Sequence, residues 1–256
     1  MENIYSGTEM PPIETKPSIL PDISPKITID PKLENIKNVG THEIPSIPNN
    51  IHYLTIIGQI EGHAVSPPQT KATKYEHIIP QLIAVEENPN VEGMITVLNT
   101  VGGDVEAGLA ISEMISTMSK PTVSLVLGGG HSIGVPLATA SNYSFIAQTA
   151  TMTIHPIRMN GLVIGVPQTF KYFQKMQERI IQFITRTSKV PREKVLDLMN
   201  ETDEIANDVG TILIGKEAVE VGLIDEIGGL YDAMEKLKEL IKINKTQREG
   251  IQKKLQ

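Results

Sequence analysis

Residues 122–140 read TVSLVLGGGHSIGVPLATA and are the strongest single indication of the fold. The apolar run 122–127 predicts a strand, glycines 128–130 a tight turn, and the apolar stretch 135–140 a helix. Ser132 falls in the turn, where backbone N–H groups and the positive end of a helix dipole converge. Such a position suits a nucleophile, but a phosphate-binding turn or a turn without a ligand has the same pattern.

A base for this serine is available about twenty residues later. His155 follows the strand-like run Thr151-Met152-Thr153-Ile154, and a nucleophilic serine needs an acceptor for its proton. A half-buried structural histidine at a strand end fits the same pattern. His131 directly precedes Ser132, and because successive turn residues point in different directions, we expect it at the rim and not as the base. The pair Ser132 and His155 favours a serine hydrolase.

Composition excludes several classes of function. The chain has 256 residues, a formal net charge of −7 and no cysteine. Nucleic-acid and anionic-membrane binding demand a basic surface, so the negative net charge argues against both. The absence of cysteine excludes thiol catalysis, disulfides and cysteine-ligated metals. We expect no cofactor and no metal. Without a secretory signal pattern or an apolar stretch of about 20 residues that could span a membrane, the expected location is the cytoplasm.

Three regions follow from the changes in composition along the chain. Residues 1–50 are polar and repeatedly interrupted by proline, which opposes helices and sheet ladders, so we expect a disordered N-terminal arm. An inert tail and a specific docking peptide both fit such an arm. The expected core spans 51–232, and a lysine-rich helix or tail follows over 233–256.

Within the core, strands and helices are expected to alternate. Asp104 follows the glycines 102–103 and is expected to cap a helix. Strand, glycine turn and helix thus occur twice, which predicts a parallel α/β sheet with ligands at the carboxyl ends of its strands. Residues 167–187 form a long predicted helix, either an association surface or a core helix. The expected strands are 53–57 (closed by Gly58), 94–98, 122–127, 143–147, 151–155, 211–214 and 223–225; further helices are expected at 78–87, after Pro191, at 216–221 and from about 230.

Over 51–232 the sequence resembles the proteolytic subunit of the Clp protease, within the wider ClpP/crotonase fold. This resemblance implies a spiral of β-β-α units with a long protruding helix. More narrowly, the chain resembles the translocation-enhancing branch of that family, although the proline-rich arm is not part of the usual Clp subunit. The matching stretches are IGQI (57–60), LNTVGG (98–103), AGLAI (107–111), GGGHSIG (128–134), MTIHP (152–156), and EA (217–218) with GLID (222–225).

The resemblance also implies roles for individual residues. Ser132 matches the family nucleophile and His155 its general base. Gly103, with Gly102, and Ile133 match the backbone N–H donors of the oxyanion hole. The implied activity is serine endopeptidase cleavage of peptides or unfolded proteins inside a closed homo-oligomeric ring. The resemblance to the translocation-enhancing branch also implies a link to protein export or signal-peptide turnover. The chain contains no P-loop, so an ATPase unfoldase would be a separate partner.

The third residue of a Ser-His-Asp triad departs from the family pattern. Counting back from Glu217 places the family aspartate on Gly210, whereas counting forward from the helix after Pro191 places it near Thr202 or Asp203. Asp208 lies two positions before Gly210 and would share its face in an extended segment, so we predict Asp208, with Asp203 as the alternative. Both aspartates also suit a turn.

Alternative functions remain open at this stage. A triad without its acid retains residual activity, so a weak peptidase or a non-catalytic interaction protein that assists translocation fits the same residues. Part of the C-terminal region is also similar to signal peptide peptidase A, a relative with a Ser-Lys pair, which makes Lys216 or Lys171 an alternative base. A crotonase-type acyl-CoA enzyme is a third possibility, since that fold also binds an oxyanion with paired glycine-turn N–H groups.

Overall fold

The computed structural model describes residues 50–158, 165–202 and 209–255. Nearly all of the predicted N-terminal arm and both candidate acids, Asp203 and Asp208, lie outside these ranges. None of the helices in the described part of the chain is long and apolar enough to cross a membrane.

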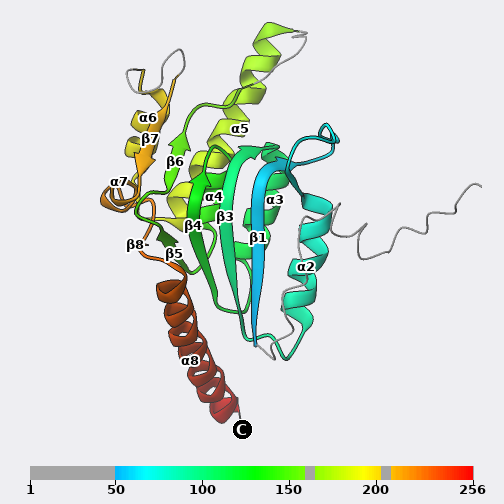
Figure 1. Cartoon of the computed structure of the whole chain (residues 1–256), viewed down its shortest axis with the longest axis vertical. Helices are drawn as coiled ribbons and strands as arrows, with labels where there is room; N and C mark the ends of the chain where they lie inside the picture. The colour runs from blue at the N-terminus through cyan, green and yellow to red at the C-terminus, as the bar shows by residue number, and fades with distance from the viewer. Residues whose placement is uncertain (1–49, 159–164, 203–208, 256) are drawn as a thin grey trace, which may run out of the picture. The chain divides into compact units, whose positions relative to one another are not determined.

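A parallel sheet forms the centre of the core, as the alternation of strands and helices predicts (Figure 1). The strand order is β2-β1-β3-β4-β5-β8, and every pair along this path is parallel. A second ladder leaves the sheet where β6 pairs with the end of β4 and then, antiparallel, with β7. The strands are β1 (Ile51–Glu61), β2 (Ala72–Lys74), β3 (Gly93–Gly103), β4 (Thr122–Gly130), β5 (Tyr143–Ile146), β6 (Thr151–Ile154), β7 (Thr211–Ile214) and β8 (Glu226–Ile227).

Helices cover both faces of this sheet. Met94 and Leu98 belong to the larger core cluster, which also contains residues of α2, α3 and α4. Their neighbour Ile95 belongs to the second cluster, where it packs with Leu237 of α8. Since successive strand residues point to opposite faces, α8 lies across the sheet from the other three helices. The helices are α2 (Tyr75–Glu87), α3 (Val105–Ser116), α4 (Gly134–Thr139), α5 (Val166–Thr187), α6 (Arg192–Asn200), α7 (Lys216–Glu220) and α8 (Leu230–Leu255).

Four predicted strand boundaries are wrong by three residues or more. β3 and β4 continue through Gly103 and Gly130, so the glycines that were expected to form turns belong to the strands. β1 does not stop at Gly58, because the Gln59 N–H donates to the Lys71 carbonyl at 2.8 Å and β2 pairs with the extension. The strand expected at 223–225 begins instead at Glu226. The N–H groups of Leu223 and Ile224 both donate to the Ala218 carbonyl at the end of α7. Because these two groups are used there, the strand starts only at Glu226.

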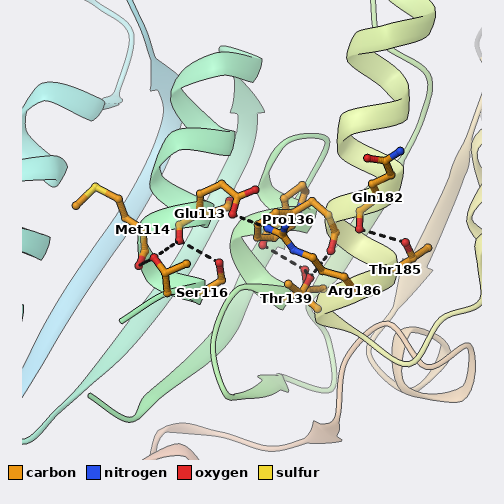
Figure 2. Close-up of polar contacts among 12 residues, drawn as sticks. Glu113, Met114, Ser116, Pro136, Thr139, Gln182, Thr185 and Arg186 are labelled. Carbon is orange, nitrogen blue, oxygen red and sulfur yellow. Dashed lines mark hydrogen bonds and ion pairs between the residues drawn. The ribbon is translucent and has the colours of Figure 1, made fainter. Parts of the chain in front are cut away.

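The expectation of a core helix holds for the second half of α5, while its first half is exposed and the expected association surface stays a prediction. Val166 and Phe170 are exposed, whereas Ile180 and Ile184 are buried in the main core. Figure 1 shows the start of α5 projecting beyond the sheet. The buried half is held by polar contacts to its neighbours: Arg186 pairs with Glu113 of α3 (Figure 2), and Thr187 with Thr139 of α4 at 2.8 Å. The helix is therefore core at one end and surface at the other.

Candidate active site

Ser132 lies in a strained turn between β4 and α4. Its φ is +58°, and among the described residues it is the one non-glycine with a positive φ. Its N–H donates to the Thr153 carbonyl at 2.8 Å, and its carbonyl accepts the N–H of Val135 at 3.0 Å. A side chain in the left-handed region is uncommon, and such strain concentrates at functional sites. Hydrogen bonds on both sides thus hold the predicted nucleophile in an unfavourable conformation.

Gly102, near the end of β3, lies close to Ser132. A β-carbon on Gly102, whose φ is +87°, would lie 2.7 Å from the Ser132 Cβ and 3.3 Å from its Oγ. A side chain at residue 102 would therefore collide with the serine. The Gly102 N–H already donates to the Thr100 hydroxyl at 3.0 Å. Because a donor used in this way is not offered to an oxyanion, the geometry favours Gly103 over Gly102 for that role.

Ser132 and His155 line the same cleft, of about 140 Å³, together with Gly103 and Ile133. The Ile133 N–H has no hydrogen-bond partner among the described residues and remains available to a ligand. Most of the lining residues are apolar, and two of them come from the buried half of α5. The other lining residues are Val105, Val135, Ile154, Pro156, Ile157, Arg158, Ile180, Ile184 and Met199.

The hydrogen bonding of His155 fixes which ring nitrogen can act as a base. Its Nδ1 lies 2.6 Å from the Pro156 carbonyl oxygen. A carbonyl only accepts, so Nδ1 carries the proton, and in the neutral ring Nε2 holds the lone pair. This is the tautomer that a serine hydrolase needs, because Nε2 takes the proton of the hydroxyl.

His131 lies half-buried against β6. Its Nδ1 is 2.8 Å from the Thr153 Oγ1. Burial lowers its pKa below the ordinary value, and the charge of His155 lowers it further. The two rings are therefore electrostatic neighbours. Thr153, which bonds both His131 and Ser132, was missed by the sequence reasoning; the only local signal is that it lies two residues before His155.

Gly210, where one count places the family aspartate, lies directly beside His155. A β-carbon there would be 2.4 Å from the Ile154 carbonyl oxygen and 2.8 Å from the His155 Cβ, and φ is +133°. Residue 210 therefore cannot carry the acid in this conformation. Its N–H donates to the Glu201 carbonyl at 2.7 Å. Both aspartates lie outside the described residues, so the identity of the acid stays a prediction.

The two alternative lysine bases do not line the cleft in the described part of the chain. Lys216 is 75% exposed and pairs with Glu220 at 2.6 Å. Lys171 lies on the exposed part of α5. The structure therefore gives a Ser-Lys pair no support.

A family model described as Clp protease matches residues 53–230. With the parallel sheet and the serine turn described above, this match shows that the chain belongs to the Clp protease family. The translocation-enhancing protein TepA of Halalkalibacterium halodurans is 61% identical to it over 210 residues, which cover 82% of each chain. Both the family and the translocation-enhancing branch expected from the sequence are thus confirmed.

More distant relatives carry protease names. An ATP-dependent Clp protease proteolytic subunit of Streptococcus salivarius is 27% identical over 157 residues, 59% of this chain and 76% of that protein. A putative protease of Methanocaldococcus jannaschii is 26% identical over 215 residues, 72% of this chain and 67% of that protein.

Proposed function

We propose that this chain is a serine endopeptidase of the ClpP type that cleaves peptides or unfolded proteins through an acyl-enzyme. One observation carries the proposal: Ser132, in its strained turn, shares a cleft with His155, whose Nδ1–H is tied to a carbonyl. A nucleophile and a correctly protonated base in one cleft are the minimum for acyl transfer.

The reaction uses these groups in sequence. His155 Nε2 takes the proton of Ser132 as Oγ attacks the substrate carbonyl, and the N–H groups of Ile133 and Gly103 stabilise the resulting oxyanion. The proton then passes from His155 to the leaving amine as the peptide bond breaks. A water molecule, deprotonated by His155, hydrolyses the acyl-enzyme and restores the serine.

Asp208, with Asp203 as the alternative, is proposed to support His155. The Pro156 carbonyl already orients the ring, but a neutral acceptor stabilises an imidazolium less than a carboxylate does. A chain that relied on this carbonyl alone would be a slow peptidase. Asp208→Asn and Asp203→Asn therefore identify the acid: the correct one slows acylation strongly and the other does not.

The cleft and the relatives suggest the substrate and the setting. Its apolar wall, which includes Ile180 and Met199, suits an apolar substrate side chain. By analogy with the Clp proteolytic subunits, we propose a homo-oligomeric ring and a separate ATPase partner. The name of the TepA relative suggests that the substrates arise during protein export, signal-peptide remnants among them.

A fluorophosphonate probe tests the proposal, because it reacts only with an activated serine. We expect intact-mass labelling of one site per chain in the wild type, lost in Ser132→Ala and strongly slowed in His155→Ala. Ser112, buried in α3 with its hydroxyl bonded to the Gly108 carbonyl, offers Ser112→Ala as the matched control that keeps labelling. A wild type that stays unlabelled while a known serine peptidase reacts would refute the proposal and favour a non-catalytic interaction protein.

A further inference from the structure

The side chain of His131 packs closely against two threonines of β6 and against Gly129. Nδ1 lies 2.8 Å from the Thr153 Oγ1, and Nε2 lies 3.5 Å from the Thr151 Oγ1. A β-carbon on Gly129 would come within 2.7 Å of Nε2. The absence of a side chain at residue 129 therefore makes room for the ring, which lies in a fitted position and does not extend into solvent.

Thr153 contacts both residues of the turn through different atoms. Its carbonyl accepts the N–H of Ser132 and its hydroxyl bonds the ring of His131, each at 2.8 Å. The left-handed conformation of Ser132 is unfavourable and relaxes unless its surroundings prevent it. Two anchors on one residue of β6 oppose that relaxation more effectively than the Ser132 amide alone.

We propose that His131 is a positioning residue for the nucleophile: its ring, bonded to Thr153, locks the Ser132 turn onto the strand that leads directly to His155. This inference rests on the proposed peptidase function and supplies the support on which the placement of the Ser132 hydroxyl depends. Substrate does not contact the ring; it acts through the turn.

The electrostatics fit this role. Burial first, and the charge of His155 second, lower the pKa of His131. Among the described residues, His155 is the charged group that acts on it. A neutral His131 places no positive charge beside the imidazolium that forms on His155. The Thr153 hydroxyl both donates and accepts, so its bond to Nδ1 forms with either tautomer.

Hydrogen–deuterium exchange at the Ser132 amide, measured by mass spectrometry on the full chain, tests this positioning role without requiring activity. The contact between His131 and Thr153 that holds the Ser132 turn is called the lock below. We expect His131→Ala and Thr153→Val each to speed this exchange about five- to tenfold, the effect of losing one hydrogen bond of ordinary strength. The double variant should be no faster than His131→Ala, because that substitution already removes the bond that Thr153→Val removes. His131→Asn and Thr153→Ser keep a hydrogen-bonding group and should restore most of the protection.

Matched controls separate a local from a general effect. His77→Ala removes an exposed imidazole on α2, and Thr185→Val removes a hydroxyl that bonds only carbonyls of its own helix. Neither control should change exchange at Ser132. Exchange in β1 should stay at the wild-type rate in every variant.

The fluorophosphonate rate, measured on the same variants, separates this inference from the proposed function. Slower labelling together with faster Ser132 exchange supports both. Unchanged exchange in His131→Ala, or additive effects in the double variant, overturns the lock whatever the labelling shows. If the wild type is not labelled but the exchange responds as expected, the lock stands and the peptidase function fails.

Discussion

The approach of Gly102 to the nucleophile leads to a quantitative prediction for Gly102→Ala. The new methyl group would lie 2.7 Å from the His131 carbonyl oxygen and from the Ser132 Cβ, at a backbone φ of +87°. A β-carbon in the left-handed region costs about 1–2 kcal/mol. Overpacking of a tight site adds about 1–3 kcal/mol. We therefore expect the free energy of unfolding to fall by about 2–5 kcal/mol.

Urea unfolding followed by circular dichroism measures this loss, and fluorophosphonate labelling of the folded variant reports on the serine. Since one of the two colliding atoms is the Cβ of Ser132, labelling should slow even where the variant is fully folded. Gly250→Ala is the matched control: no atom lies within 4 Å of its would-be β-carbon in α8, so the same change should stabilise the chain by about 0.5–1 kcal/mol. A Gly102→Ala variant whose unfolding free energy lies within about 0.5 kcal/mol of the wild type would show that Gly102 does not approach Ser132 closely.

Three further substitutions test the framework around the site, each by urea unfolding. Lys120→Met should lower the unfolding free energy by about 1–3 kcal/mol, because the buried ammonium donates to the carbonyls of Val85, at 2.6 Å, and Asn88 at the end of α2. Asp104→Ala should cost about 1 kcal/mol, since the carboxylate accepts the Ala107 N–H at 2.8 Å and caps α3. His52→Leu should stabilise the chain, because the buried His52 Nε2 has no partner among the described residues. Burial also lowers the pKa of His52 below 6.5, so below that pH the unfolded chain binds more protons than the folded chain. The unfolding free energy of the wild type therefore falls as the pH drops. The difference in unfolding free energy between His52→Leu and the wild type should widen from neutral pH toward about pH 5. A gap that stays constant or narrows would contradict the assigned pKa direction.

Local patterns were sufficient to predict the parts of the fold that depend on neighbouring residues. The apolar run 122–127 and the Asp104 cap are local signals, and the strand and the capped helix both form. The glycines 128–130 do not form the expected turn, because they extend β4 and the turn begins after them. The end of β1 was wrong because its extension depends on Lys71, a residue of a different segment. β8 was displaced because the bonds that close α7 compete with the expected strand.

The candidate site shows the same division. Ser132 and His155 could be selected from motif and order, and they line one cleft. The double role of Thr153 could not be predicted, because it arises only when β6 packs beside the end of β4. The loss of Gly102 as a donor depends on the orientation of the Thr100 hydroxyl, which the sequence does not specify.

The division of α5 into two halves constrains how the helix can vary. An α-helix turns by about 100° per residue. Deleting one residue between Phe173 and Met176 would rotate the exposed aromatic end by that angle relative to Ile180 and Ile184, which line the cleft. Point substitutions can alter either half alone, but insertions and deletions of fewer than three residues change the angular relation between the outer surface and the cleft.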